Sequence, residues 1–68
     1  MIYPQKIDYL QRVIYLAKES RRQCFALKNH CQHMKDFLNA EIYDRKQSAF
    51  RETIERAERD IELLKRAN

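Results

Sequence analysis

The side chains best able to bind a metal lie close together in this chain, at Cys24, His30, Cys31 and His33. A zinc site needs four such ligands that converge as a tetrahedron. On a single helix His30 and His33 share a face, but Cys31 points about 100° away from His30 and Cys24 lies two turns off. We therefore interpret the cysteines as packing residues with histidines beside them, and expect neither a metal ion nor another cofactor.

The two cysteines are also badly placed for a disulfide. On a helix, residues seven apart share a face but are separated by about 10.5 Å along the axis, whereas bridged cysteines have Cα atoms within about 7 Å. The sequence predicts two free thiols, as in a reducing compartment. It shows no secretion signal, and its longest apolar run, Val13 to Ala17, is too short for a membrane span. We expect a cytoplasmic protein that does not bind membranes.

Catalytic motifs are missing from the sequence. A phosphate-binding loop and a nucleophile elbow both require glycine, and the chain has none; it also lacks the His-Glu-x-x-His pattern of zinc proteases. The carboxylates alternate with arginines at helical spacing, as on a solvated surface. We predict that the protein is not an enzyme.

The absence of glycine also predicts the fold class. The 68 residues contain one proline, Pro4, and otherwise favour helix formers. Sheet proteins of this size need tight turns that glycine usually supplies. We expect an all-α protein with a single helical-hairpin domain over residues 1–68. The core of such a hairpin is thin, so dimerisation or a partner is expected to complete it.

The second half carries one narrow apolar stripe. Its residues recur at alternating spacings of four and three, the a/d pattern of a coiled coil. They are Phe50, Ile54, Ala57, Ile61 and Leu64.

The first half is more broadly apolar. One stripe comprises Tyr3, Ile7, Leu10, Ile14 and Ala17, and a second comprises Tyr9, Val13 and Leu16. After a polar stretch the pattern resumes at Cys24, Leu27, Cys31, Met34 and Leu38.

Two places could interrupt the helices. Asn39 tolerates left-handed geometry, and Asp44 to Gln47 fits a capping box, so we predict the hairpin turn between Asn39 and Asp44, with arms of about 34 and 24 residues. Ser20 to Gln23 fits a second capping box, and a break there would give three helices. One uninterrupted helix is the remaining alternative.

The apolar surplus of the first arm indicates a binding surface. A partner helix with one narrow stripe cannot cover both stripes of the first arm, and uncovered apolar surface rimmed by charge usually marks a protein interface. We expect the partner to contact Tyr3, Tyr9, Val13, Tyr15 and Leu16, with Arg12 and Arg21 at the edge. The alternative is that a break at Ser20 lets the first segment fold back as a third core helix.

These features favour a small helical protein-binding module, either a chaperone-like adaptor or an inhibitor. Its partner is another protein, a second copy of the chain, or both. The alternative function is a homodimeric four-helix bundle that binds RNA or regulates transcription. Its basic stripe would comprise Arg12, Arg21, Arg22 and Lys28. The sequence favours a protein partner over nucleic acid, since the tyrosines have the spacing of packing residues.

Residues 42–64 resemble the smallest chaperones of the type III secretion needle. The resemblance consists of Tyr43, Phe50 and the run from Ile54 through Ala57 to Ile61 within a glycine-free hairpin. In that family a short helical hairpin pairs with a larger repeat-type chaperone, and together they keep the needle subunit monomeric in the bacterial cytoplasm. The resemblance implies the same kind of partner here, and it does not extend to the first arm.

Overall fold

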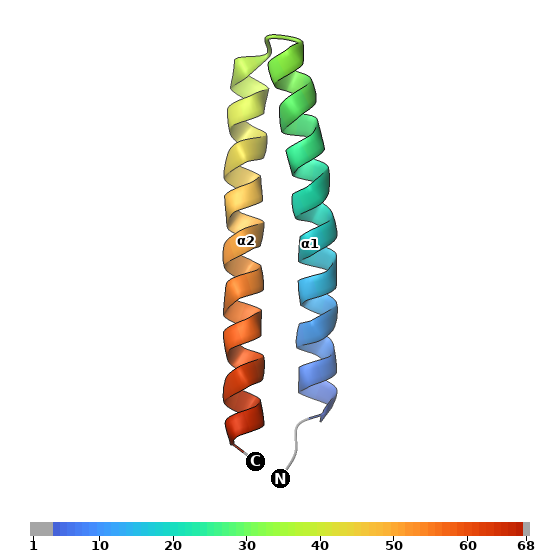
Figure 1. The fold of residues 1–68 in the computed structure, drawn as a ribbon, viewed down its shortest axis with the longest axis vertical. Coiled ribbons are helices and arrows are strands. Elements are labelled where there is room, and N and C mark those ends of the chain that lie inside the picture. Colours follow the sequence, from blue (N-terminus) through green and yellow to red (C-terminus); the bar gives the residue numbers. More distant parts are fainter. Residues whose placement is uncertain (1–3, 68) are drawn as a thin grey trace.

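The computed structural model describes residues 4–67, which form two long helices joined by a tight turn (Figure 1). Helix α1 comprises Pro4–His33 and helix α2 comprises Phe37–Arg66, so each has 30 residues. The two helices run antiparallel along a rod that measures 53 × 13 × 10 Å. The predicted all-α, two-helix hairpin is confirmed.

Helix α2 faces α1 with a regular heptad stripe. The predicted stripe from Phe50 to Leu64 is confirmed, because each of its residues is buried or half-buried. The stripe also continues toward the turn at the same spacing. The added members are Ala40, Tyr43 and Gln47.

Helix α1 contributes a stripe with a seven-residue repeat. Leu10, Ala17, Cys24 and Cys31 follow one another at this spacing, and all four are buried or half-buried. The helix continues through Ser20 without a break. The three-helix alternative and the folded-back first segment are therefore wrong. We name the contact line between the stripes of α1 and α2 the seam. The polar interruption is tolerated because the seam passes directly from Ala17 to Cys24, while Arg21 lies at its edge and is exposed.

The turn comprises Met34–Asp36. The predicted turn between Asn39 and Asp44 is therefore wrong. The alternative of a single uninterrupted helix is also wrong. Lys35 takes the left-handed conformation, with φ of 61°. Its N–H donates to the carbonyl of Gln32 at 3.1 Å, and the N–H of Asp36 donates to the carbonyl of Cys31 at 2.7 Å. These are the two hydrogen bonds of a Schellman motif, in which glycine usually holds the left-handed position.

Helix α2 then begins at once because Asp36 caps it. One oxygen of the Asp36 carboxylate accepts from the backbone N–H of Asn39 at 3.4 Å, and the other accepts from the Asn39 side-chain amide at 2.7 Å. An aspartate that accepts a backbone N–H three residues later is a favoured N-cap. Asn39 thus stabilises the start of α2 and does not end a helix.

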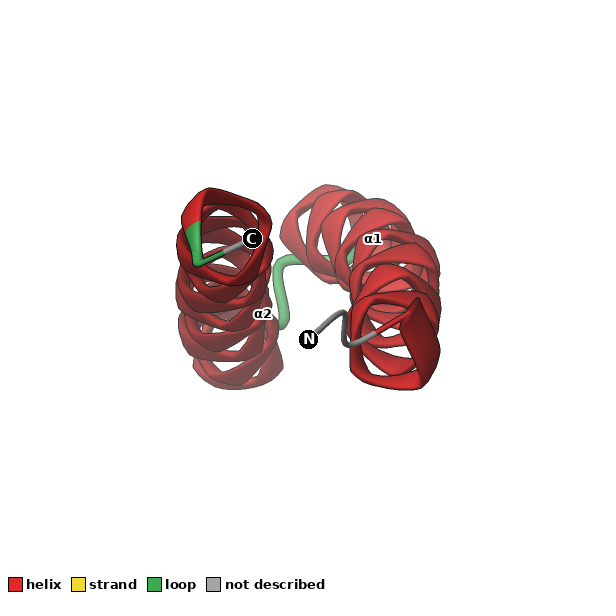
Figure 2. Ribbon diagram, turned by 90° about the horizontal axis from the view of Figure 1, so that it is seen from below, coloured by secondary structure: helices red, strands yellow, loops and turns green. Residues whose placement is uncertain are grey.

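Two helices lie side by side with no third layer (Figure 2), so the core is the single interface between them. Among the described residues no large side chain is fully buried, and four of the six buried residues are alanine or cysteine. The chain exposes 5696 Å², against about 4,600 Å² for a compact monomer of its mass, 8.3 kDa. The difference of about 1,100 Å² reflects the rod shape of the hairpin, in which most side chains of both helices face solvent.

We predict that Ile54→Ala or Ile61→Ala lowers the free energy of unfolding by about 2–4 kcal/mol, because each removes a buried aliphatic group. Arg59→Ala, at an exposed position, should cost less than about 0.5 kcal/mol. Urea unfolding followed by circular dichroism measures both. Equal costs would show that the seam is assigned wrongly.

The turn yields a second prediction. Lys35→Gly should raise the free energy of unfolding by about 0.5–1 kcal/mol, because glycine adopts a positive φ without the steric cost that lysine bears. The matched control Lys46→Gly, within α2, should lower it by about 1 kcal/mol. If both glycines destabilise the hairpin alike, the left-handed turn is not formed.

Candidate protein-binding face

The seam divides the hairpin surface into two sides with different chemistry. On one side the Lys28 ammonium lies 2.8 Å from the Asp44 carboxylate and links α1 to α2. On the other side Lys6 of α1 lines a shallow hollow together with Asp60, Leu63 and Leu64 of α2. These two clusters fix which heptad positions of each helix lie side by side.

The side marked by Lys6 is predominantly apolar. Val13 and Leu27 follow Lys6 by one and three heptads, and Phe50 and Tyr43 precede Leu64 by two and three, so they lie along the same side. We name this side the apolar face. It comprises Tyr9, Val13, Leu16 and Leu27 of α1 with Ile42, Tyr43, Phe50, Leu63 and Leu64 of α2.

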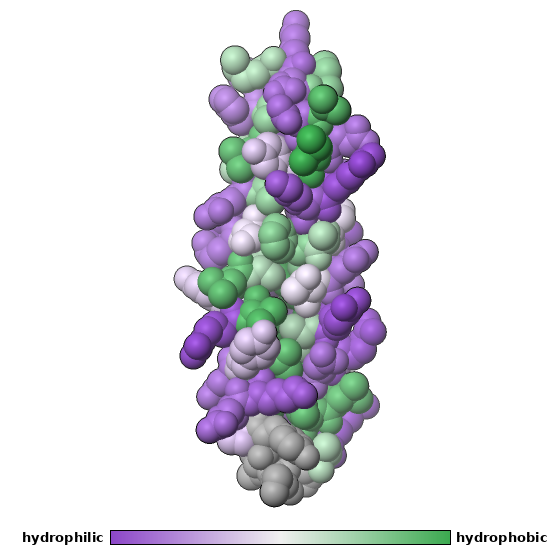
Figure 3. Space-filling view, turned by 180° about the vertical axis from the view of Figure 1, so that it is seen from behind, coloured by the Kyte–Doolittle hydropathy of each residue, from purple (hydrophilic) through white to green (hydrophobic). Residues whose placement is uncertain are grey.

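Figure 3 looks onto this side of the rod, where apolar side chains follow the line between the two helices along most of its length. Several of these side chains remain largely open to solvent: Tyr9 is 63% exposed, Leu16 58% and Leu63 56%. Val13, Phe50 and Leu64 are half-buried and form the floor between them. These side chains form one apolar strip with a half-buried floor.

The structure separates the residues that the sequence proposed for partner contact. Tyr9, Val13 and Leu16 lie together on the apolar face, and exposed Arg12 lies at its edge. Tyr15 is 65% exposed, but it precedes the buried Ala17 by two residues and therefore points away from α2.

Two more of the proposed residues do not join this group. Arg21 lines a hollow with Lys28 and Asp44 on the opposite side of the seam. Tyr3 lies outside the described residues.

Sequence reasoning missed the contribution of α2 to this face. It treated Phe50 and Leu64 as seam residues only, although both are half-buried and reach the surface beside α1. Leu63 directly precedes a seam residue, and Ile42 precedes Leu63 by three heptads, a spacing that could have revealed them.

Charged residues border the apolar face. The basic ones outnumber the acidic ones, with Lys6, Arg12, Lys46 and Arg56 against Glu19 and Asp60. The Lys46 ammonium lies 5.6 Å from the centroid of the Tyr43 ring, a cation–π distance at the rim.

The cysteines and histidines are divided between the seam and the surface. Cys24 is buried and Cys31 is half-buried, both as free thiols. His30 and His33 are exposed. Over residues 4–67 no three side chains of the histidine, cysteine, aspartate and glutamate types come together as a metal site would require.

Neither α1 nor α2 has a stretch that is both long and apolar enough to cross a lipid bilayer; this holds for residues 4–67. Comparison of the chain with protein-family models, with curated proteins and with solved structures gives no match.

The burial of the thiols leads to a prediction. A thiol-reactive disulfide reagent such as dithionitrobenzoate should modify Cys31 faster than Cys24, because only Cys31 reaches solvent in the folded hairpin. Cys24→Ser and Cys31→Ser assign the two kinetic phases, and denaturant should make the rates equal. Equal rates in the folded protein would contradict the position of the seam.

Proposed function

We propose that this chain is a small protein-binding module without catalytic activity, which docks an apolar helix of a partner protein onto its apolar face. The observation that carries the proposal is the row of exposed and half-buried apolar side chains contributed by both helices. The site therefore spans α1 and α2, and is wider than the first helix alone.

The solvent-exposed area of the hairpin is consistent with an interface of standard size. The surface exceeds that of a compact monomer of equal mass by about 1,100 Å². A standard protein interface covers about 800 Å² on each partner. Covering the apolar face with one more helix would bring the exposed area close to that of a compact protein.

The shape of the face supports a helical ligand. Each helix extends for about 45 Å at 1.5 Å per residue, and the apolar residues follow the groove between them along most of this length. An amphipathic helix in such a groove buries its apolar stripe against both neighbours, as in a helical bundle. The basic excess at the rim favours a partner whose stripe is flanked by acidic residues.

A chaperone-like adaptor or an inhibitor is the class of module that these features support. In both cases binding covers an apolar helix of the partner and prevents its other contacts. The resemblance of residues 42–64 to the hairpin co-chaperones of the secretion needle supports the adaptor. A second copy of the chain, as in a homodimeric bundle, would use the same face.

The experiment is affinity capture of partner proteins from the native host, with identification by mass spectrometry before and after nuclease treatment. Leu16→Asp should abolish capture, because it places a charge in the centre of the apolar face at a position that does not support the seam. The matched control Tyr15→Asp makes the same change one residue away, on the outer surface of α1, and should leave capture intact.

Circular dichroism of both variants should show unchanged helicity, which confirms that any loss is a loss of binding. The proposal is wrong if Leu16→Asp captures the same proteins as the unmodified chain, or if Tyr15→Asp loses them equally. The proposal is also wrong if every captured protein is lost with nuclease, because nucleic acid then bridges those proteins to the chain and none of them contacts the apolar face.

A further inference from the structure

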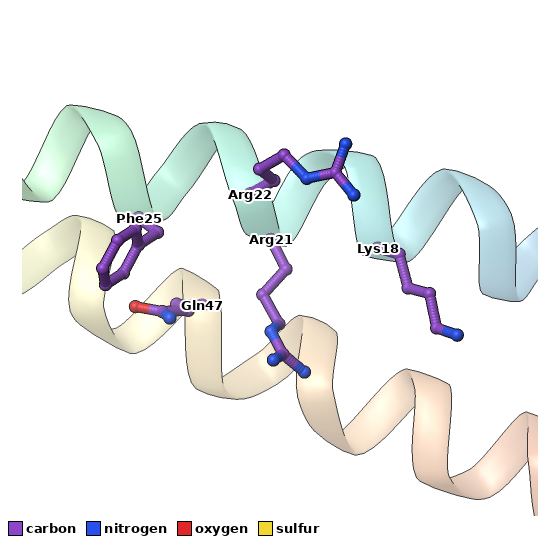
Figure 4. Close-up of a pocket in the computed structure, with 5 residues that line it drawn as sticks. All are labelled: Lys18, Arg21, Arg22, Phe25 and Gln47. Atoms are coloured by element: carbon purple, nitrogen blue, oxygen red, sulfur yellow. The ribbon is translucent and has the colours of Figure 1, made fainter.

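The side opposite the apolar face carries a second feature, a groove of about 420 Å³ between the helices (Figure 4). Lys18, Arg21 and Phe25 of α1 line it, with Gln47 of α2. Toward the turn it continues into a smaller hollow. Residues of this hollow include Arg21, Phe25, Lys28, Asp44 and Arg51. We name the two together the basic groove.

The lining of the basic groove is mostly basic. It includes five basic side chains and one carboxylate, Asp44. One of the five, Arg22, is ion-paired with Glu19, which leaves a local excess of three positive charges once both ion pairs are counted. A local excess of one sign attracts ligands of the opposite charge.

Two arginines occupy opposing heptad positions in this groove. Lys28 and Asp44 are opposite one another, with their charged atoms 2.8 Å apart. Arg21 precedes Lys28 by one heptad and Arg51 follows Asp44 by one heptad, so the antiparallel register sets Arg21 opposite Arg51. Both line the same hollow. In one heptad this pair of positions holds the ion pair of Lys28 and Asp44, and in the next heptad it holds two like charges, Arg21 and Arg51.

No carboxylate of the described residues forms an ion pair with either arginine. Arg22 is bonded to Glu19 at 3.0 Å and Lys28 to Asp44 at 2.8 Å, whereas Lys18, Arg21 and Arg51 form no ion pair within residues 4–67. Figure 4 shows Arg21 reaching from α1 toward α2 beside Gln47, while Arg22 stays along α1. Opposed guanidinium groups repel each other, and an anion between them removes the repulsion.

Phe25 gives the groove an aromatic surface. Its side chain points toward Gln47 of α2 and is 50% exposed, next to the unpaired cations. An aromatic ring beside a row of cations is the usual means of binding a single nucleic-acid strand, since bases stack on the ring and phosphates contact the cations. Lys18 and Lys28 are about 15 Å apart along α1. A stacked strand places about four phosphates over that length.

We propose that the basic groove binds single-stranded nucleic acid, with a phosphate between Arg21 and Arg51 and a base on Phe25. An acidic peptide would satisfy the arginines but would leave the half-exposed aromatic ring without a role. The proposal is independent of partner binding on the apolar face, because the two surfaces lie on opposite sides of the seam.

The test uses the full chain and a fluorescein-labelled single-stranded RNA of about 12 nucleotides, followed by fluorescence anisotropy. Three unpaired cations predict that the logarithm of the binding constant falls with the logarithm of salt concentration with a slope of about −2 between about 50 and 200 mM. Inorganic phosphate at matched ionic strength should compete far more weakly than unlabelled RNA, because it contacts the arginines but offers no base to Phe25, and an oligoglutamate of equal charge should also compete weakly. Competition by oligoglutamate as strong as by unlabelled RNA would overturn the proposal in favour of an acidic protein ligand.

Two pairs of variants locate the site. Arg21→Gln with Arg51→Gln should weaken RNA binding at least tenfold, whereas Arg45→Gln with Arg59→Gln, which removes the same charge from exposed positions of α2, should change it less than about twofold. Phe25→Ala should weaken binding about tenfold, and Tyr15→Ala, at an exposed ring outside the groove, should not. Equal losses within either pair would mean that the RNA follows overall charge or hydrophobicity and not this groove.

Arg51→Glu separates a binding role from a structural one. It replaces the like-charged pair with a pair of opposite charge, as at Lys28 and Asp44, so the melting temperature should rise by about 1–4 °C while RNA binding is lost. A fall in melting temperature would contradict the register that sets Arg21 opposite Arg51.

Discussion

The packing of α1 against α2 through a single stripe is the constraint on which the rest of this structure depends. Alanines and a cysteine fill most of its buried positions, and Ile54 and Ile61 are the large side chains among them. Small residues let the helices approach closely, but they bury little area. A stripe one residue wide leaves the flanking positions of both helices at the surface. The side chains at these positions are therefore not required for packing of the two helices.

The two sides of the seam carry different kinds of side chain. On one side the residues beside the seam are apolar and include half-buried Val13 and Phe50. On the other side, across the same seam, the charged residues Arg21, Lys28 and Arg51 border the groove. One hairpin thus presents two surfaces with different preferences, which we propose bind an apolar helix and a nucleic-acid strand.

The sequence predicted the helical class, the hairpin and the stripe of α2, because the heptad from Phe50 to Leu64 is regular and no glycine interrupts it. It misplaced the turn because the signals used for turns were absent where the turn occurs. Lys35 adopts a left-handed conformation for which lysine has no preference. The sequence interpretation did not consider Asp36, whose carboxylate caps α2. It interpreted Asp44 as a helix cap, whereas Asp44 forms an ion pair with Lys28.

The two proposed binding surfaces were only partly predictable for a related reason. Periodicity shows which residues of one helix share a face, so Tyr9, Val13 and Leu16 were grouped correctly. It does not show which residues of the second helix lie beside them, because that depends on the turn. Moving the turn from residues 39–44 to Met34–Asp36 changes the register, which then sets Arg21 opposite Arg51.

The hairpin should gain stability when its apolar face is covered, because the seam buries only one stripe of each helix. Thermal unfolding of the isolated chain, followed by circular dichroism over about a hundredfold range of protein concentration, tests it most directly. We expect a broad transition whose midpoint rises with protein concentration, because a second copy of the chain covers the apolar face. A sharp transition with one midpoint at every concentration, from a species of 8.3 kDa, would contradict it.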